Sequence, residues 1–131
     1  MKGFKFVYSI SCRNCCSILS RKAMKSVLLT NTSIRLFSSN NPTPNVRALH
    51  STYVTRSCEC MISNIKCTAC NSLVGYTIVS PCELCLRDKN NGHHWMFDLT
   101  AISSCIRIQG LNVLRWISDA RIDEESELRI R

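Results

Sequence analysis

The chain has 131 residues, a length typical of one domain, and its 45% hydrophobic and 20% charged composition excludes a disordered or fibrous protein. The length argues against a large catalytic fold, and no apolar run approaches the roughly 18 residues of a membrane span. Seventeen basic residues against nine acidic ones give a formal net charge of +8, which suits an acidic partner.

In chain order, the pattern predicts mostly β structure. Strands are expected at residues 27–29 and 34–36, with a turn at 31–32, followed by a loop at 38–45 that is rich in Ser, Asn and Pro. Residues 46–60 and 71–79 also favour strands. Gly75 inside the second of these indicates a bulge or a close backbone approach.

The rest of the chain continues this pattern. We expect a turn at 88–92, an apolar strand at 95–97 and short strands around Gly110 within 101–116. Residues 118–131 carry five acidic and three basic side chains and predict a short frayed helix or tail. The predicted domains are therefore an extension at 1–9, a zinc-binding β domain at 10–117 and an acidic tail at 118–131.

Ten cysteines are the most informative feature of the chain. A Cys-x-x-Cys turn presents two thiolates to one side, as a tetrahedral zinc site requires. Cys16 and Cys105 are left over and are expected to be small buried or half-buried residues. The remaining eight form four pairs: Cys12/Cys15, Cys67/Cys70, Cys82/Cys85 and the tighter Cys58/Cys60.

Four pairs supply eight ligands, enough for two structural zinc sites. We favour an interleaved arrangement, because joining neighbouring pairs would leave the first pair without a nearby partner. His93 or His94 could replace a cysteine, although a polar turn there is the simpler interpretation. The predicted ligands are Cys12, Cys15, Cys67 and Cys70 for site 1, and Cys58, Cys60, Cys82 and Cys85 for site 2.

A disulfide framework in a secreted protein is the alternative interpretation of so many cysteines. The first residues lack an apolar signal-peptide core and a small-residue cleavage site, so zinc in a reducing compartment is favoured. We therefore expect a cytoplasmic or nuclear protein. The acid-free first 58 residues superficially resemble a mitochondrial transit peptide, but a metal-binding pair and strand patterns within them favour folded structure.

The chain has the Cys12/Cys15 pair, then the Cys67/Cys70 pair after 51 intervening residues, and then Leu73-Val74-Gly75-Tyr76. This order resembles the Yippee-type zinc fold. That fold is also found in the kinetochore Mis-eighteen proteins and in the ligand-binding domain of cereblon. The resemblance implies a small single-domain β-tent in which two antiparallel sheets meet at zinc. It also supports the ligand set of site 1.

A closer resemblance is to the eukaryotic family with sequence similarity 72, carried by segments in the same order at 24–29, 58–60, 65–70, 74–76, 79–85, 90–97 and 112–116. This resemblance implies a non-enzymatic adaptor. Vertebrate members bind nuclear uracil-DNA glycosylase and promote its loss through a ubiquitin ligase, which lowers base-excision repair. The family motif carries the partner-contacting tryptophan onto Trp116.

Three other functions are weaker. An enzyme needs an open metal position or an activated nucleophile, whereas eight cysteines would close two sites, so no catalytic residue is predicted. A RING-like ubiquitin ligase lacks support, because 42 residues separate Cys15 from Cys58, the start of the next pair along the chain. Direct nucleic-acid binding by a basic zinc protein is the main alternative, although the basic residues are scattered and aromatics make up only 7%.

The partner surface is expected to include Trp116, with Arg115 beside it and Trp95 as a further candidate. Trp and Arg often dominate interface energies. Trp95 and Phe97 alternate on one strand, so they can instead share a buried face. Trp116 lies late in the chain next to an arginine, which favours a surface position.

Overall fold

The computed structural model describes residues 6–27, 34–55, 59–83, 93–117 and 121–122. Within these residues, nine antiparallel strands form one sheet in the order β4-β6-β7-β8-β3-β2-β1-β9, with β5 also paired to β6. The strands are β1 (Tyr8–Cys12), β2 (Ile18–Val27), β3 (Arg35–Ser39), β4 (Val46–Ala48), β5 (Tyr53–Val54), β6 (Met61–Cys67), β7 (Leu73–Ser80), β8 (Trp95–Asp98) and β9 (Ile102–Ile106).

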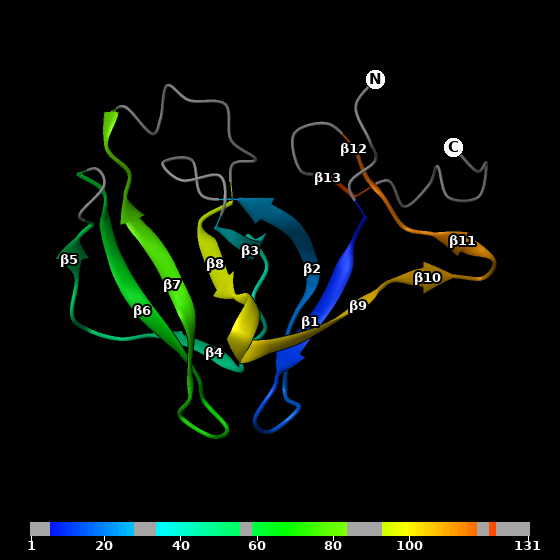
Figure 1. Cartoon of the computed structure of the whole chain (residues 1–131), viewed down its shortest axis with the longest axis horizontal. Coiled ribbons are helices and arrows are strands. Elements are labelled where there is room, and N and C mark those ends of the chain that lie inside the picture. The colour runs from blue at the N-terminus through cyan, green and yellow to red at the C-terminus, as the bar shows by residue number, and fades with distance from the viewer. Residues whose placement is uncertain (1–5, 28–33, 56–58, 84–92, 118–120, 123–131) are drawn as a thin grey trace.

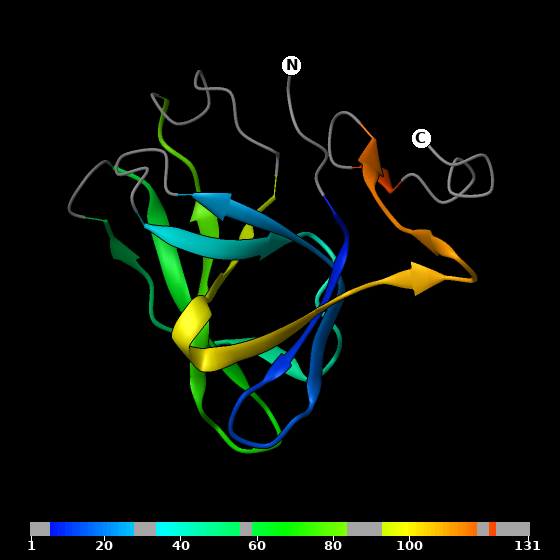
Figure 2. The ribbon, with the colours of Figure 1, turned by 45° about the vertical axis from the view of Figure 1, so that its right-hand side comes forward.

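The sheet is strongly curled, because the ten-residue strand β2 belongs to two parts of it (Figures 1 and 2). Its first half pairs with β1, from Ile18 opposite Ser11 to Ala23 opposite Tyr8, and the register shifts twice along the way. Its second half, from Met24 to Val27, pairs with β3. Bulges of this kind increase local twist and bend a sheet. The predicted mostly β fold is confirmed, and β2 joins the two expected sheets into one curled sheet.

The concave side of the curl holds the core. The inward side chains of β1, β3, β6 and β8 are almost fully buried, among them Ile10, Phe37, Ile65 and Phe97. The expected close approach at Gly75 is confirmed: a Cβ there would overlap the carbonyl oxygen of Met96 on β8. Strands whose side chains alternate in this way bury one face, and this burial fixes the register between neighbouring strands.

The chain leaves β8 through the short 3-10 turn η1 (Leu99–Ala101) and enters β9, an end strand of the sheet. A projecting hairpin follows, made of β10 (Ile108–Gln109) and β11 (Asn112–Val113). The chain then returns to the sheet, where Phe6 and Arg115 form an isolated bridge. The expected short strands around Gly110 are therefore present.

Some predicted elements differ from the structure. Strand β3 continues through Ser39, because the side chains of Ser20 and Ser39 are buried and share a hydrogen bond. The loop therefore starts later than expected. Residues 121–122 are not helical: β13 (Arg121–Ile122) pairs with β12 (Trp116–Ile117). The turns expected at 31–32 and 88–92 lie outside the described residues, as does the remainder of the tail. Strand β1 begins at Tyr8, within the predicted extension.

Aromatic and polar packing joins the strands at the end of the sheet opposite the cysteine loops (Figure 1). The indole N–H of Trp116 donates to the Ala23 carbonyl on β2 at 3.3 Å, and its ring lies 5.2 Å from that of His93. His93 Nδ1 is 2.8 Å from Ser38 Oγ. No helix within the described residues is long and apolar enough to cross a membrane.

Candidate metal centre

The first cysteine pair occupies the tight turn between β1 and β2. The Cys16 N–H donates to the Cys12 carbonyl at 2.7 Å, and the Cys12 N–H donates to the Ser17 carbonyl at 2.8 Å. Cys16 has a φ of +68°, a left-handed conformation that usually costs a residue with a side chain about 1 kcal/mol or more. This closed loop, residues 12–17, is called the first knuckle.

The second knuckle, residues 67–72 between β6 and β7, repeats the same backbone. The Asn71 N–H donates to the Cys67 carbonyl at 2.7 Å, and the Cys67 N–H donates to the Ser72 carbonyl at 2.9 Å. Asn71 has a φ of +64°. Both knuckles therefore follow the pattern Cys-x-x-Cys-x-Ser with a left-handed fifth residue.

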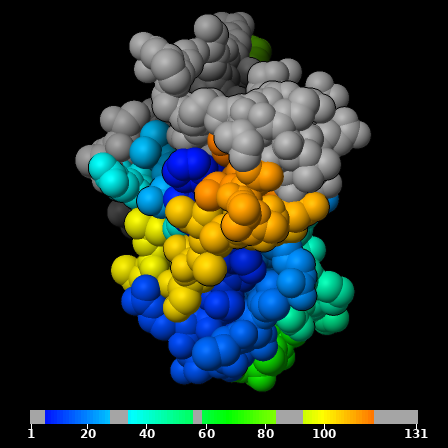
Figure 3. Space-filling view, turned by 90° about the vertical axis from the view of Figure 1, so that its right-hand side faces the viewer, coloured from blue at the N-terminus to red at the C-terminus, as the bar shows by residue number. Residues whose placement is uncertain are grey.

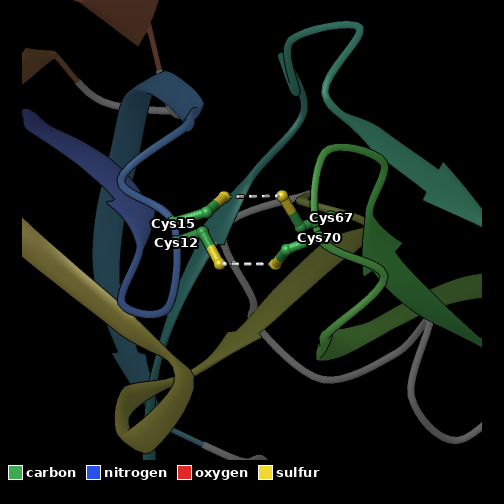
Figure 4. Close-up of side chains that lie close together, drawn as sticks. All are labelled: Cys12, Cys15, Cys67 and Cys70. Carbon is green, nitrogen blue, oxygen red and sulfur yellow. Dashed lines mark hydrogen bonds between the residues drawn. The ribbon is translucent and has the colours of Figure 1, made fainter.

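The curl of the sheet brings the two knuckles face to face (Figure 4). Their four sulfur atoms, from Cys12, Cys15, Cys67 and Cys70, lie within 4.8 Å of one another. The Cys12–Cys70 sulfur distance is 3.6 Å and the Cys15–Cys67 distance is 3.5 Å. A tetrahedron with Zn–S bonds of about 2.3 Å has sulfur atoms about 3.8 Å apart. The donor set and its spacing thus fit a four-thiolate zinc ion.

The surroundings shift the pKa values of the cysteine thiols in different directions. Burial raises the pKa of the Cys12 thiol to about 11. Hydrogen bonds from Ser72 and then Asn14 lower the pKa of Cys70 to about 6, and Ser17 lowers the pKa of Cys15. Each serine hydroxyl lies 3.2 Å from the sulfur two residues before it. These hydroxyls are placed to donate to metal-bound thiolates.

Each knuckle is held from the side by a different neighbour. The Arg13 backbone N–H donates to the Ala101 carbonyl at 3.0 Å, which fixes the first knuckle to η1. The Thr68 N–H donates to the Asn45 carbonyl at 2.8 Å, which fixes the second knuckle to the turn before β4. Because all these groups belong to strand ends and tight turns, the cluster sits on rigid elements.

Of the residues predicted for site 2, the structure describes two. The Cys60 and Cys82 sulfur atoms lie 3.6 Å apart, and the Cys82 N–H donates to the Cys60 sulfur at 3.3 Å. Cys58 and Cys85 lie outside the described residues. The expectation that Cys16 and Cys105 are buried or half-buried is wrong: both are exposed, Cys16 in the left-handed turn position and Cys105 on the end strand β9.

The three candidates for partner binding occupy different environments. Trp95 on β8 is partly buried and packs against the core. Arg115 is only 6% exposed, which does not suit a side chain that contacts a partner, because the chain buries it beside Phe6. Trp116 is half-buried, with its indole N–H bonded to the Ala23 carbonyl on β2 and its ring beside that of His93.

The sequence contained one signal that was not used. Serine stands two residues after the last cysteine of both the first and the second pair, as Ser17 and Ser72. No corresponding serine follows Cys85, where Arg87 stands. This shared serine position predicts that Cys12/Cys15 and Cys67/Cys70 form equivalent turns. It could have strengthened the assignment of these two pairs to one site.

Two comparisons with known proteins agree with this geometry. The crystal structure of the Mis18 "Yippee-like" domain is similar to this chain, with a TM-score of 0.58 and 18% identity over 79% of this chain and 98% of that one, which shows a shared fold. Residues 2–130 match the family model described as Yippee homolog 2 zinc finger protein. The chain therefore belongs to the Yippee homolog zinc finger family, and the Yippee resemblance of its cysteine spacing is confirmed.

Proposed function

We propose that this protein is a non-enzymatic interaction domain whose fold is stabilised by structural zinc. The observation that carries the proposal is the convergence of four thiols on two rigid, equivalent knuckles. Cys12, Cys15, Cys67 and Cys70 would fill all four zinc positions. A closed four-thiolate ion contributes folding energy and offers no position for a catalytic water.

The position of the cluster explains what the zinc does for the fold. The first knuckle belongs to the β1–β2 part of the sheet, and the second belongs to the β6–β7 part. A zinc ion bound to all four sulfurs connects these two parts at the open side of the curl. Apparent binding energies of structural zinc are on the order of 10 kcal/mol, comparable with the whole stability of a small domain.

A second structural zinc at Cys58, Cys60, Cys82 and Cys85 is also proposed. It is supported by the proximity of the Cys60 and Cys82 sulfurs, which join the start of β6 to the segment after β7. In both sites the ligands would come from chain segments that adjoin antiparallel strands. The two sites would therefore hold the ends of the same β6–β7 hairpin.

The direct test is metal stoichiometry on the purified full chain, by elemental analysis beside a thiol count with and without chelator. Two zinc ions and two freely reactive thiols support both sites. One zinc ion that survives Cys60→Ser but not Cys67→Ser supports the first site alone. Absence of both zinc and free thiols would indicate disulfides and would contradict the proposal, including the expected reducing compartment.

The proposed partner is uracil-DNA glycosylase, with a ubiquitin ligase acting on the captured glycosylase. Support comes from the sequence resemblance and from Trp116, which is half-buried and whose indole N–H anchors it to β2. Such a held aromatic side chain loses little entropy on binding. The domain would then act as an adaptor that lowers base-excision repair.

Capture of purified uracil-DNA glycosylase by the zinc-loaded chain tests this assignment. Trp116→Ala should weaken capture by about 2 kcal/mol or more, the size of an interface hot spot. Val54→Ala, at an exposed position on β5, serves as the matched control. Zinc content and a thermal melt are measured in parallel. Unchanged capture by a folded Trp116 variant excludes Trp116 from the interface, and no capture by the parent chain removes this partner.

A further inference from the structure

The end strand β9 has one hydrogen-bonding edge that the rest of the sheet does not use. The Ala101 carbonyl accepts from Arg13 and the Arg107 N–H donates to the Val7 carbonyl, so the odd-numbered residues between them face β1. Backbone groups alternate direction along a strand. The N–H and C=O groups of Ser104 and Ile106 therefore point to the opposite edge.

No strand within the described residues pairs with that edge, since β9 ends the strand order. Among the described residues, two side chains contact carbonyls of β9: Arg13 donates to the Ile102 carbonyl at 2.9 Å, and the Cys105 thiol lies 3.6 Å from the Ile106 carbonyl. The space-filling view shows this part of the chain at the surface (Figure 3). The four residues after Ile102 are exposed.

Strand β9 also lacks the features that usually protect an edge. Its sequence, ISSCI, contains no charge and no proline, and its register with β1 is regular over all five residues. Natural proteins normally block such edges with lysine, proline, a bulge or a covering segment. An unprotected edge of this kind is a template for an added strand.

The surroundings of β9 are cationic. Arg13 lies at its beginning and Arg107 at its end, where the Arg107 guanidinium donates to the Arg21 carbonyl at 2.9 Å. The exposed Arg21 and Lys25 lie on β2, which β1 separates from β9. The structure describes three carboxylates, of Glu59, Glu83 and Asp98. Asp98, the nearest in sequence to β9, accepts from the Thr100 backbone and hydroxyl.

The two faces beside the edge differ. Register with β1 places Ile106 opposite Tyr8 and Ile102 opposite Cys12, so these isoleucines share the core-side face. Ile106 is nevertheless 38% exposed there, and the neighbouring Ile108 is 64% exposed. Ser103 and Cys105 lie on the other face. An added strand would thus place alternate side chains near exposed isoleucines and near polar side chains.

We propose that β9 binds an extended segment of a partner polypeptide, with alternating acidic and apolar residues, by strand addition. Backbone bonds to Ser104 and Ile106 would align the segment. Its apolar residues would contact Ile106, and its acidic residues would be attracted by the arginines at both ends of β9. The proposal rests on the proposed interaction function and specifies the chemistry of the segment that is recognised.

Amide hydrogen exchange on the full zinc-loaded chain provides the first test. The amides of Ser103 and Cys105 should exchange slowly, because they bond to β1, whereas those of Ser104 and Ile106 should exchange rapidly. A blocked peptide of repeated Glu-Val pairs should slow exchange at Ser104 and Ile106. Slow exchange at these two amides in the free chain would overturn the proposal, because the edge would already be covered by the chain itself or a second copy.

Two pairs of variants then separate the backbone contribution from the charge. Ser104→Pro removes the outward N–H, and Ser104→Ala keeps it; we expect about a tenfold loss of Glu-Val peptide binding only for the proline variant. Arg107→Glu should weaken binding about threefold, and Arg47→Glu on β4, at the other end of the strand order, should not. Zinc content and melting temperature confirm that each variant is folded.

Equal binding of a Lys-Val peptide, or full binding by Ser104→Pro, would overturn the inference. If oligothymidine binds the parent chain, binds Arg107→Glu more weakly and binds Ser104→Pro equally well, the basic surface would be assigned to nucleic acid instead. The outcome is separable from the assignment of uracil-DNA glycosylase. If the Ser104→Pro variant captures that enzyme at parental affinity, only the strand-addition proposal is refuted. If the parent chain binds the Glu-Val peptide but does not capture the enzyme, only the assignment of uracil-DNA glycosylase as the partner is refuted.

Discussion

Two ends of the same curled sheet are joined by different interactions. At one end, the two knuckles bring together four thiols whose spacing fits a zinc ion. At the other, Trp116, His93 and Ser38 connect β12, the start of β8 and β3 through a ring contact and hydrogen bonds. The first end is rigid and repetitive in sequence. The second is assembled from single residues that are far apart in the chain.

Because of this difference, the two ends of the sheet should respond differently to mutation. A zinc site is lost as a unit when one ligand is removed, because the remaining thiolates hold the metal far less tightly. Packing and hydrogen bonds are lost in smaller steps of about 1–3 kcal/mol. Mutations at the metal end should therefore have all-or-none effects, and mutations at the opposite end should have graded ones.

The largest effect is expected from Cys67→Ser. Cys67 is fully buried, and its loss should abolish zinc binding at the knuckles and unfold at least the β1–β2 and β6–β7 ends. Zinc content and circular dichroism measure this directly. Cys16→Ser is the matched control, because Cys16 stands next to a ligand position but is exposed and lies outside the cluster. Equal zinc loss in both variants would contradict the ligand assignment.

An intermediate effect is expected from acidification at His93. Burial lowers its pKa to about 4 from the usual 6.5, so the unfolded chain binds the proton first and stability falls as the pH drops below 6.5. Between pH 7.5 and 5.5, the loss should be about 1 kcal/mol. Denaturant unfolding of the zinc-loaded chain at the two pH values measures it. His93→Gln should flatten this dependence, and an unchanged slope would refute it.

A smaller effect is expected when one knuckle loses its serine hydroxyl. Ser17→Ala and Ser72→Ala should each reduce zinc affinity about tenfold, as loss of a hydrogen bond to a metal ligand typically does. Competition with a chromophoric chelator measures the change. Ser103→Ala, an exposed serine on β9, controls for the substitution itself. If the two knuckle variants match this control, the hydroxyls do not support the thiolates.

The smallest effect distinguishes the two knuckles from each other. Both have a left-handed fifth residue, but Asn71 tolerates that conformation better than Cys16 does. Cys16→Gly should stabilise the zinc-loaded protein by about 0.5–1 kcal/mol, and Asn71→Gly by less. Thermal melts compare them. A loss of stability in Cys16→Gly would show that the Cys16 side chain makes a contact that compensates its backbone strain.

Sequence reasoning predicted the metal end well. The pattern Cys-x-x-Cys specifies its own turn, since the two cysteines and the left-handed residue after them lie within five positions. Spacing also favoured pairing Cys12/Cys15 with Cys67/Cys70, and the structure brings these four sulfurs together. The second group remains a prediction, with Cys60 near Cys82 as its support.

The opposite end was predicted less well. Arg115 was expected at a surface and is buried, and Cys105 was expected to be buried or half-buried and is exposed on β9. Neither outcome follows from the neighbouring residues. Burial at these positions depends on which strand ends the sheet and on where the chain returns after the β10–β11 hairpin.

The strand pattern, the two knuckle turns and the zinc chemistry could be predicted from local sequence, because these depend on alternation and on residues a few positions apart. The bend of β2 between β1 and β3, and the edge of β9 that has no strand partner among the described residues, became known from the three-dimensional fold. The physical reason is that strand order and curl follow from contacts between distant segments. A periodic pattern states which face of a strand is buried, but not which strand lies beside it.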